Sequence, residues 1–140
     1  MVADWLYQVR IKVNENLSDM LRKRELIGTS KEIYEIAEFH GTTPVCTYDA
    51  FCEYCSEAER EGTDKYPLYD WTKQVIGDPN KKKKHVKSFA FYIGNEQVYE
   101  KKIAELLHTD LLGLHHAGLI EDLILIDSNP KNNPQPPKKN

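Results

Sequence analysis

Three cysteines and one histidine, all with side chains that can bind metal, lie close together in the sequence: His40, Cys46, Cys52 and Cys55. Thiolates and imidazoles are the usual ligands of structural zinc, and Cys52 and Cys55 have the C-x-x-C spacing of many such sites. A cysteine with a histidine as its base would instead suit a thiol-dependent enzyme. The third interpretation is buried free thiols, because cysteine is among the most buried residue types. We expect no cofactor, with zinc as the alternative.

A basic and aromatic string, Lys87-Ser88-Phe89-Ala90-Phe91-Tyr92, could bind nucleic acid. It resembles the RNP1 string of RNA-recognition motifs, in which charge and rings alternate along one exposed strand face. The resemblance implies a phosphate contact for Lys87 and base stacking for Phe89 and Phe91. On the alternative interpretation, both rings belong to the more apolar face of a strand and pack against helices.

Charge is unevenly distributed along the chain. The formal net charge is −3, yet residues 66–94 carry +4 and lie between two regions of −5 each. The basic residues concentrate in a run of lysines: Lys81, Lys82, Lys83 and Lys84. Acidic residues recur at helical spacing at Glu53, Glu57 and Glu61. Both groups are either solvated surfaces or binding surfaces for a charged protein partner.

The composition and the absence of motifs narrow the class of protein. Hydrophobic residues make up 40% and charged residues 29% of the 140 residues, which is typical of a folded domain rather than a membrane or disordered chain. No run of about 18 apolar residues and no secretory signal occurs, so we expect a cytoplasmic protein with reduced thiols and no membrane partner. No zinc-protease, nucleophile-elbow, Walker or dinucleotide-binding motif is present. This favours a domain that is not an enzyme.

Apolar spacing and turn residues predict the elements that would position these groups. Residues 5–13 alternate between apolar and polar, as in a half-buried strand. Gly77-Asp78-Pro79-Asn80 has the composition of a turn and predicts a hairpin of strands over 68–76 and 85–93, with the lysines in its loop. We expect the remaining elements to be helices within 14–28, 29–41, 47–62, 95–108 and 111–117 and a last strand over 123–126.

This order predicts an α+β domain over residues 1–127, a ferredoxin-like β-α-β-β-α-β sandwich with an enlarged helical insertion after strand 1. Residues 128–140 are rich in Pro, Asn and Lys and should form a disordered tail. The strand Leu123–Ile126 is apolar along its whole length, although the last strand of this fold lies at a sheet edge. We therefore expect a homodimer through this strand.

Together these observations predict a small non-enzymatic interaction or regulatory domain that binds a protein partner through its charged surfaces. The acidic helix and the lysine run would be the two contact surfaces. One alternative is binding of single-stranded RNA or DNA through the basic hairpin and the RNP1-like strand. The other is a metal- or thiol-dependent enzyme.

Overall fold

A four-stranded antiparallel sheet forms the centre of this α+β protein, in a computed structural model that describes residues 6–127. The predicted tail, residues 128–140, and the first position of the predicted first strand lie outside the described residues. The strands follow the order β2-β3-β1-β4, and all three neighbouring pairs are antiparallel. They are β1 (Tyr7–Lys12), β2 (Thr43–Cys46), β3 (Ser88–Tyr92) and β4 (Asp122–Asp127).

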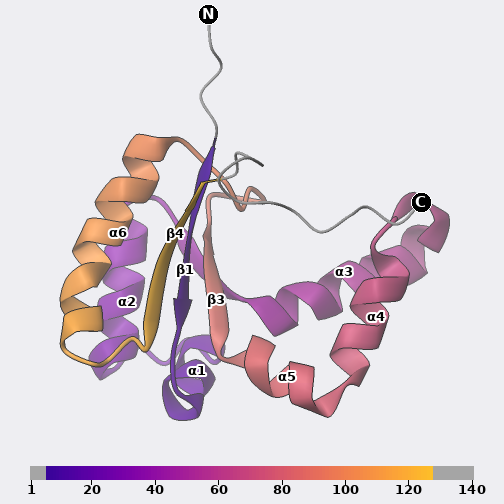
Figure 1. Ribbon diagram of the computed structural model, residues 1–140, viewed down its shortest axis with the longest axis horizontal. Helices are drawn as coiled ribbons and strands as arrows, with labels where there is room; N and C mark the ends of the chain where they lie inside the picture. Colours follow the sequence, from indigo (N-terminus) through magenta and orange to yellow (C-terminus); the bar gives the residue numbers. More distant parts are fainter. Residues whose placement is uncertain (1–5, 128–140) are drawn as a thin grey trace, which may run out of the picture.

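One face of the sheet packs against three helices and forms the hydrophobic core. These helices are α1 (Glu15–Arg22), α2 (Gly28–Phe39) and α6 (Lys101–His116). The alternation in the first strand is confirmed, since Val9 and Ile11 are buried in this core while Arg10 between them faces the other way. In Figure 1, α2 and α6 lie together on one side of the sheet.

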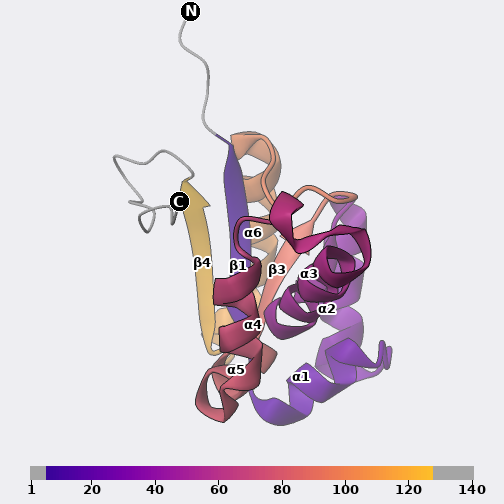
Figure 2. The same ribbon diagram turned by 90° about the vertical axis from the view of Figure 1, so that its right-hand side faces the viewer.

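The other face is covered only in part, by a helical arm that comprises residues 47–86. The arm contains α3 (Thr47–Glu61), the 3₁₀ turn η1 (Thr63–Lys65), α4 (Tyr69–Gly77) and α5 (Pro79–Val86). Figure 1 shows the arm on the opposite side of the sheet from α2 and α6. Seen from the arm side in Figure 2, β4 lies beside the arm and is not covered by it. The part of this face formed by β4 is therefore open.

The predicted hairpin is wrong over its first strand and its loop. Residues 68–76 lie mainly in α4, and all four lysines of the run lie in α5. The aromatic and β-branched residues that favoured a strand have helical spacing, with Thr72 and Val75 both buried. Asp78 caps α5 instead of forming a turn, because its carboxylate accepts hydrogen bonds from Asn80 N–H at 2.9 Å and Lys81 N–H at 3.4 Å.

The helical insertion lies after the second strand rather than after the first. Sequence reasoning missed β2, which has only four residues and includes a proline. Two helices, α1 and α2, connect β1 to β2, and the arm then connects β2 to β3. The third predicted helix agrees with α3. The helices predicted over 95–108 and 111–117 form one continuous helix, α6, which begins only at Lys101, so the prediction was wrong for residues 95–100. Among residues 6–127, no helix has the length and apolar composition to cross a bilayer.

Candidate ligand-binding site

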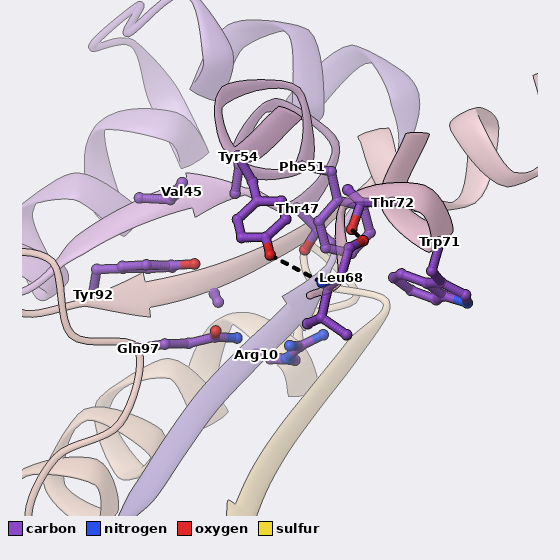
Figure 3. Close-up of a pocket in the computed structure, with 12 residues that line it drawn as sticks. Arg10, Val45, Thr47, Phe51, Tyr54, Leu68, Trp71, Thr72, Tyr92 and Gln97 are labelled. Carbon is purple, nitrogen blue, oxygen red and sulfur yellow. Dashed lines mark hydrogen bonds between the residues drawn. The ribbon is translucent and has the colours of Figure 1, made fainter. Parts of the chain in front are cut away.

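A cavity of about 250 Å³ lies between the open face of the sheet and the helical arm. Its sheet side is formed by Arg10, Val45, Ala90 and Tyr92. Its arm side is formed by Thr47, Ala50, Phe51, Tyr54, Leu68, Trp71 and Thr72, and Gln97 closes it from the segment before α6. Figure 3 shows Arg10 and Gln97 on the sheet side, with Tyr54, Leu68 and Trp71 opposite them.

The register of the sheet brings the residues on the sheet side together. Arg10 pairs with Ala90, and Ala90 pairs with Val45, so these three side chains form a row across three strands on the same face. Ala90 is small, and it leaves space between the larger residues on either side. The cavity is thus built by strand pairing between segments far apart in the sequence.

Arg10 is the charged group of the cavity. Its Nε donates a hydrogen bond to Gln8 Oε1 at 2.8 Å, and Gln97 Nε2 donates to the same oxygen at 3.0 Å. Burial lowers the pKa of the guanidinium, which still leaves it protonated at neutral pH. Within residues 6–127, no carboxylate lies within ion-pair distance of Arg10. A half-buried cation without a counter-ion is costly unless a ligand supplies the negative charge.

Two tyrosine hydroxyls add hydrogen-bond donors to the cavity. Burial raises the pKa of Tyr92, and the nearby charge of Arg10 opposes that shift. Tyr54 Oη accepts a hydrogen bond from Leu68 N–H at 3.2 Å, as drawn in Figure 3, so its own proton remains to be donated. Tyr92 lies on the sheet side of the cavity with Arg10, and Tyr54 lies on the arm side.

Aromatic rings form the wall on the arm side. Phe51 packs edge-on against Trp71, with ring centroids 5.8 Å apart, and against His85, with ring centroids 5.1 Å apart. Burial lowers the pKa of His85, and the positive charges of Lys84, Arg10 and Lys81 lower it further. His85 does not itself line the cavity, but it contacts the cavity wall at Phe51. The arrangement suits a ligand with an apolar, planar body and a negative end.

The cavity lacks the groups that most enzymes use for proton transfer or nucleophilic attack. Its twelve lining residues include no Asp, Glu, His, Cys or Lys. Its ionisable side chains are one arginine and two tyrosines, which bind anions through hydrogen bonds and charge.

The acidic residues and the lysines that were predicted to contact a partner are exposed, and the lysines lie on a helix instead of in a loop. Glu53, Glu57 and Glu61 are all exposed along α3, and the last of them lies 3.6 Å from Arg60 Nε. The lysine run, Lys81, Lys82, Lys83 and Lys84, is also exposed. Successive residues of a helix are about 100° apart, so these lysines project around α5 instead of forming one flat surface.

The RNP1-like rings are not on an exposed face. Phe89 is 1% and Phe91 is 0% exposed, and both belong to the core beneath α1, α2 and α6. Lys87 caps the carboxyl end of α5. Base stacking requires rings that a base can reach, so these two phenylalanines do not support it in this fold.

The predicted zinc ligands do not come together. His40 Nε2 lies 2.6 Å from Asp110 Oδ2, and Cys46 Sγ lies 3.4 Å from the Val86 carbonyl oxygen. All three cysteines are free, and burial raises the pKa of the Cys46 and Cys55 thiols, which weakens them as nucleophiles. Among residues 6–127, no group of three or more His, Cys, Asp or Glu side chains is arranged to hold a metal ion.

Sequence reasoning did not single out Arg10 or Tyr92. The alternation in the first strand does place Gln8, Arg10 and Lys12 on the face away from the core. Nothing local distinguishes Arg10 from Lys12, because only the position of the arm makes one of them line a cavity. Comparison with protein families, curated proteins and solved structures finds no match to this chain.

Proposed function

We propose that this protein is a small ligand-binding domain that takes an organic anion into the cavity between the sheet and the helical arm. The observation that carries this proposal is the half-buried guanidinium of Arg10, which has no carboxylate partner within residues 6–127. A carboxylate or a phosphate monoester would neutralise it and accept two hydrogen bonds from it.

The shape of the cavity limits the ligand further. A volume of about 250 Å³ is below the roughly 300–1,000 Å³ of sites for drug-sized molecules. Phe51 and Trp71 offer ring faces and edges to a planar body, and Tyr54 and Tyr92 offer hydroxyl donors. We therefore expect a small aromatic acid with its charged end at Arg10.

Titration of the full-length protein with benzoate and phenyl phosphate, followed by calorimetry or NMR chemical shifts, tests this proposal. Inorganic phosphate and benzamide serve as probes that lack the ring or the charge. The Arg10→Met variant should lose roughly tenfold to a hundredfold in affinity, because hydrogen bonds to a charged group contribute about 1.5–3 kcal/mol. Tyr92→Phe should lose less, since it removes one neutral donor.

Lys12→Met is the matched control for this experiment. Lys12 lies two residues from Arg10 on the same face of β1, but it does not line the cavity. Its affinity for either aromatic acid should equal that of the wild-type protein. The proposal is wrong if neither acid binds or if benzamide binds as tightly as benzoate. It is also wrong if Arg10→Met and Lys12→Met have the same affinity for the acids.

A second candidate is binding of a protein partner with a basic surface along α3. Glu53 and Glu57 are exposed on one face of this helix and have no cation within ion-pair distance among the described residues. Like charges at this spacing destabilise a helix slightly unless a partner neutralises them. In a pull-down, the double variant Glu53→Gln, Glu57→Gln should fail to retain a partner whose binding to the wild-type protein weakens as the salt concentration rises. Salt-dependent binding of single-stranded RNA to α5 would favour the nucleic-acid alternative instead.

We also propose that the fold is an elaborated ferredoxin-like sandwich. Two features support this assignment: β3 lies between β1 and β2 in the sheet, and β1 lies between β3 and β4, so each half forms a split β-α-β unit. The free cysteines support a reducing, cytoplasmic location.

A further inference from the structure

The two edges of the sheet differ in how well they are protected from pairing with another strand. β2 has four residues, contains Pro44 and runs directly into α3, so it offers little free backbone. β4 has six residues without proline or lysine, and its four central residues are apolar. It pairs with β1 on one side, and Figure 2 shows no described element along the other. β4 is therefore an open edge.

Hydrogen bonds near the ends of β1 show which of its residues bond toward β4. Tyr7 exchanges two backbone hydrogen bonds with Tyr99, at 2.7 and 2.8 Å, on the β3 side of the strand. Odd-numbered residues of β1 thus bond on that side. The Lys12 carbonyl accepts from Glu121 N–H at 2.8 Å, so even-numbered residues bond toward β4.

This alternation determines which backbone groups of β4 point outward. Arg10 and Gln8 are even-numbered, and they lie opposite Ile124 and Ile126. The N–H and C=O groups of those two isoleucines therefore point toward β1. Because backbone direction alternates along a strand, the N–H and C=O groups of Leu123 and Leu125 point away from the sheet.

β4 is complementary to itself about a two-fold axis that passes through Ile124, perpendicular to the sheet. In that register Leu123 of each copy lies opposite Leu125 of the other, and their outward groups form four hydrogen bonds. The two Ile124 side chains meet at the axis as a non-hydrogen-bonded pair, which has the shorter separation. Ile124 is 50% exposed in the single chain, so this contact would bury it.

The exposure of Ile124 distinguishes this register from the alternatives. A two-fold axis through Leu125 would place Leu123 opposite Asp127, just as the axis through Ile124 places Ile126 opposite Asp122. Only the axis through Ile124 brings the two copies of Ile124 together, and Ile124 is the one exposed residue among the four apolar residues of β4. A two-fold axis perpendicular to the sheet cannot pass between two residues, because residues paired across antiparallel strands lie on the same face.

We propose that a second copy of this chain binds antiparallel along β4, with the two Ile124 side chains on the axis, and joins the two sheets into one of eight strands. Ile124 lies opposite Arg10 on the same face of the sheet but does not line the cavity. The two proposals are told apart by their measurements, since mass in solution reports the dimer and calorimetry reports the ligand. An open edge without charges along its centre is the kind of surface that other proteins protect or pair.

The test is the mass of the full-length protein in solution, measured by sedimentation across a range of concentrations. The wild-type protein should reach twice the mass of the 16.2 kDa chain. Ile124→Lys and Ile124→Glu should each be monomeric, because like charges would meet on the axis. An equimolar mixture of the two variants should recover the dimer, since opposite charges then meet.

Thr43→Lys is the control for charge on an edge strand. Thr43 is exposed on the same face of the sheet as Ile124 but lies on β2, at the other edge. This variant should remain dimeric. Circular dichroism should show that all variants are folded. A monomeric wild-type protein, a dimeric Ile124→Lys variant, or a mixture that stays monomeric would each overturn the proposal.

Discussion

The two faces of the sheet use the same strands for different purposes. On one face, Phe89 and Phe91 are completely covered by helices. On the other, Ala90 and Tyr92 line a cavity beside Arg10. The two sets are offset by a single residue along β3, because side chains alternate between faces. The comparison shows that one strand can supply both the packing that stabilises the fold and the surface that would bind a ligand.

The difference lies in what covers each face. The core face packs against α1, α2 and α6 along its full width, while the arm covers only part of the opposite face. Complete burial stabilises the fold through apolar contacts. Partial cover leaves polar groups half-buried. Their desolvation costs free energy in the free protein, and a bound ligand can offset that cost. We therefore expect substitutions on the core face to lower the free energy of unfolding far more than substitutions on the open face.

The largest effect is expected on the core face. Phe91→Ala removes a fully buried ring and should lower the free energy of unfolding by about 3–5 kcal/mol. Ile124→Ala, on the opposite face, should cost less than about 1 kcal/mol in the monomer because its side chain is already half exposed. Denaturant unfolding of both variants measures the difference. Equal losses would show that the open face contributes to the core.

An effect of intermediate size on stability is expected from the ionisation of Tyr99, a buried tyrosine of the core. Burial raises its pKa to about 12, against about 10 in an unfolded chain. The unfolded state then loses its proton first, so stability is retained below pH 10 and lost as the pH rises from about 10 to about 12. Between pH 9 and pH 11 this contribution amounts to about 1.4 kcal/mol.

Denaturant unfolding of the wild-type protein and of Tyr99→Phe at both pH values isolates this contribution. The variant should lose less stability than the wild type over that interval, because phenylalanine has no proton to release. Tyr92→Phe provides the matched control on the other face of the sheet, where the nearby charge of Arg10 opposes the upward shift of the tyrosine pKa. The same alkaline loss in wild type and Tyr99→Phe would contradict the assignment.

The smallest effect is expected at Arg10, and its sign is opposite to that of Phe91→Ala. Replacing a half-buried, unpaired cation by Met removes a desolvation cost and should stabilise the protein by about 1 kcal/mol. The same variant should weaken binding of benzoate, so stability and affinity would change in opposite directions. Thermal unfolding without ligand measures the first effect. A clear destabilisation would mean that the guanidinium has a structural role.

Local patterns were sufficient for several elements. The apolar alternation from residue 5 predicted β1, and α3 was predicted from Thr47 to its glycine stop at Gly62. Local patterns failed where the same residues are compatible with two different structures. Asp78 and Pro79 suit both a turn and a helix start, and only the hydrogen bonds of the Asp78 carboxylate distinguish the two. The β2 strand was missed because four residues are too few to show a period.

In the candidate site, too, some residues could be placed from the sequence and others only from the tertiary structure. The polar residues of β1 could be assigned to one face from the sequence, and the acidic residues of α3 could be assigned to an exposed stripe. The RNP1-like string could not be resolved, because alternation shows that Phe89 and Phe91 share a face but not which face the helices cover. Packing placed both rings in the core.

The amino-acid sequence by itself determined the class of this protein, an α+β domain, and the period of most of its helices and strands, because these depend on residues a few positions apart. The tertiary structure decided which face of the sheet became the core and which became the cavity. It also decided that Arg10, and not Lys12, lies under the arm. Such choices depend on contacts between segments more than thirty-five positions apart, such as Arg10 with Ala90 and Val45 with Ala90, and no local pattern carries that information.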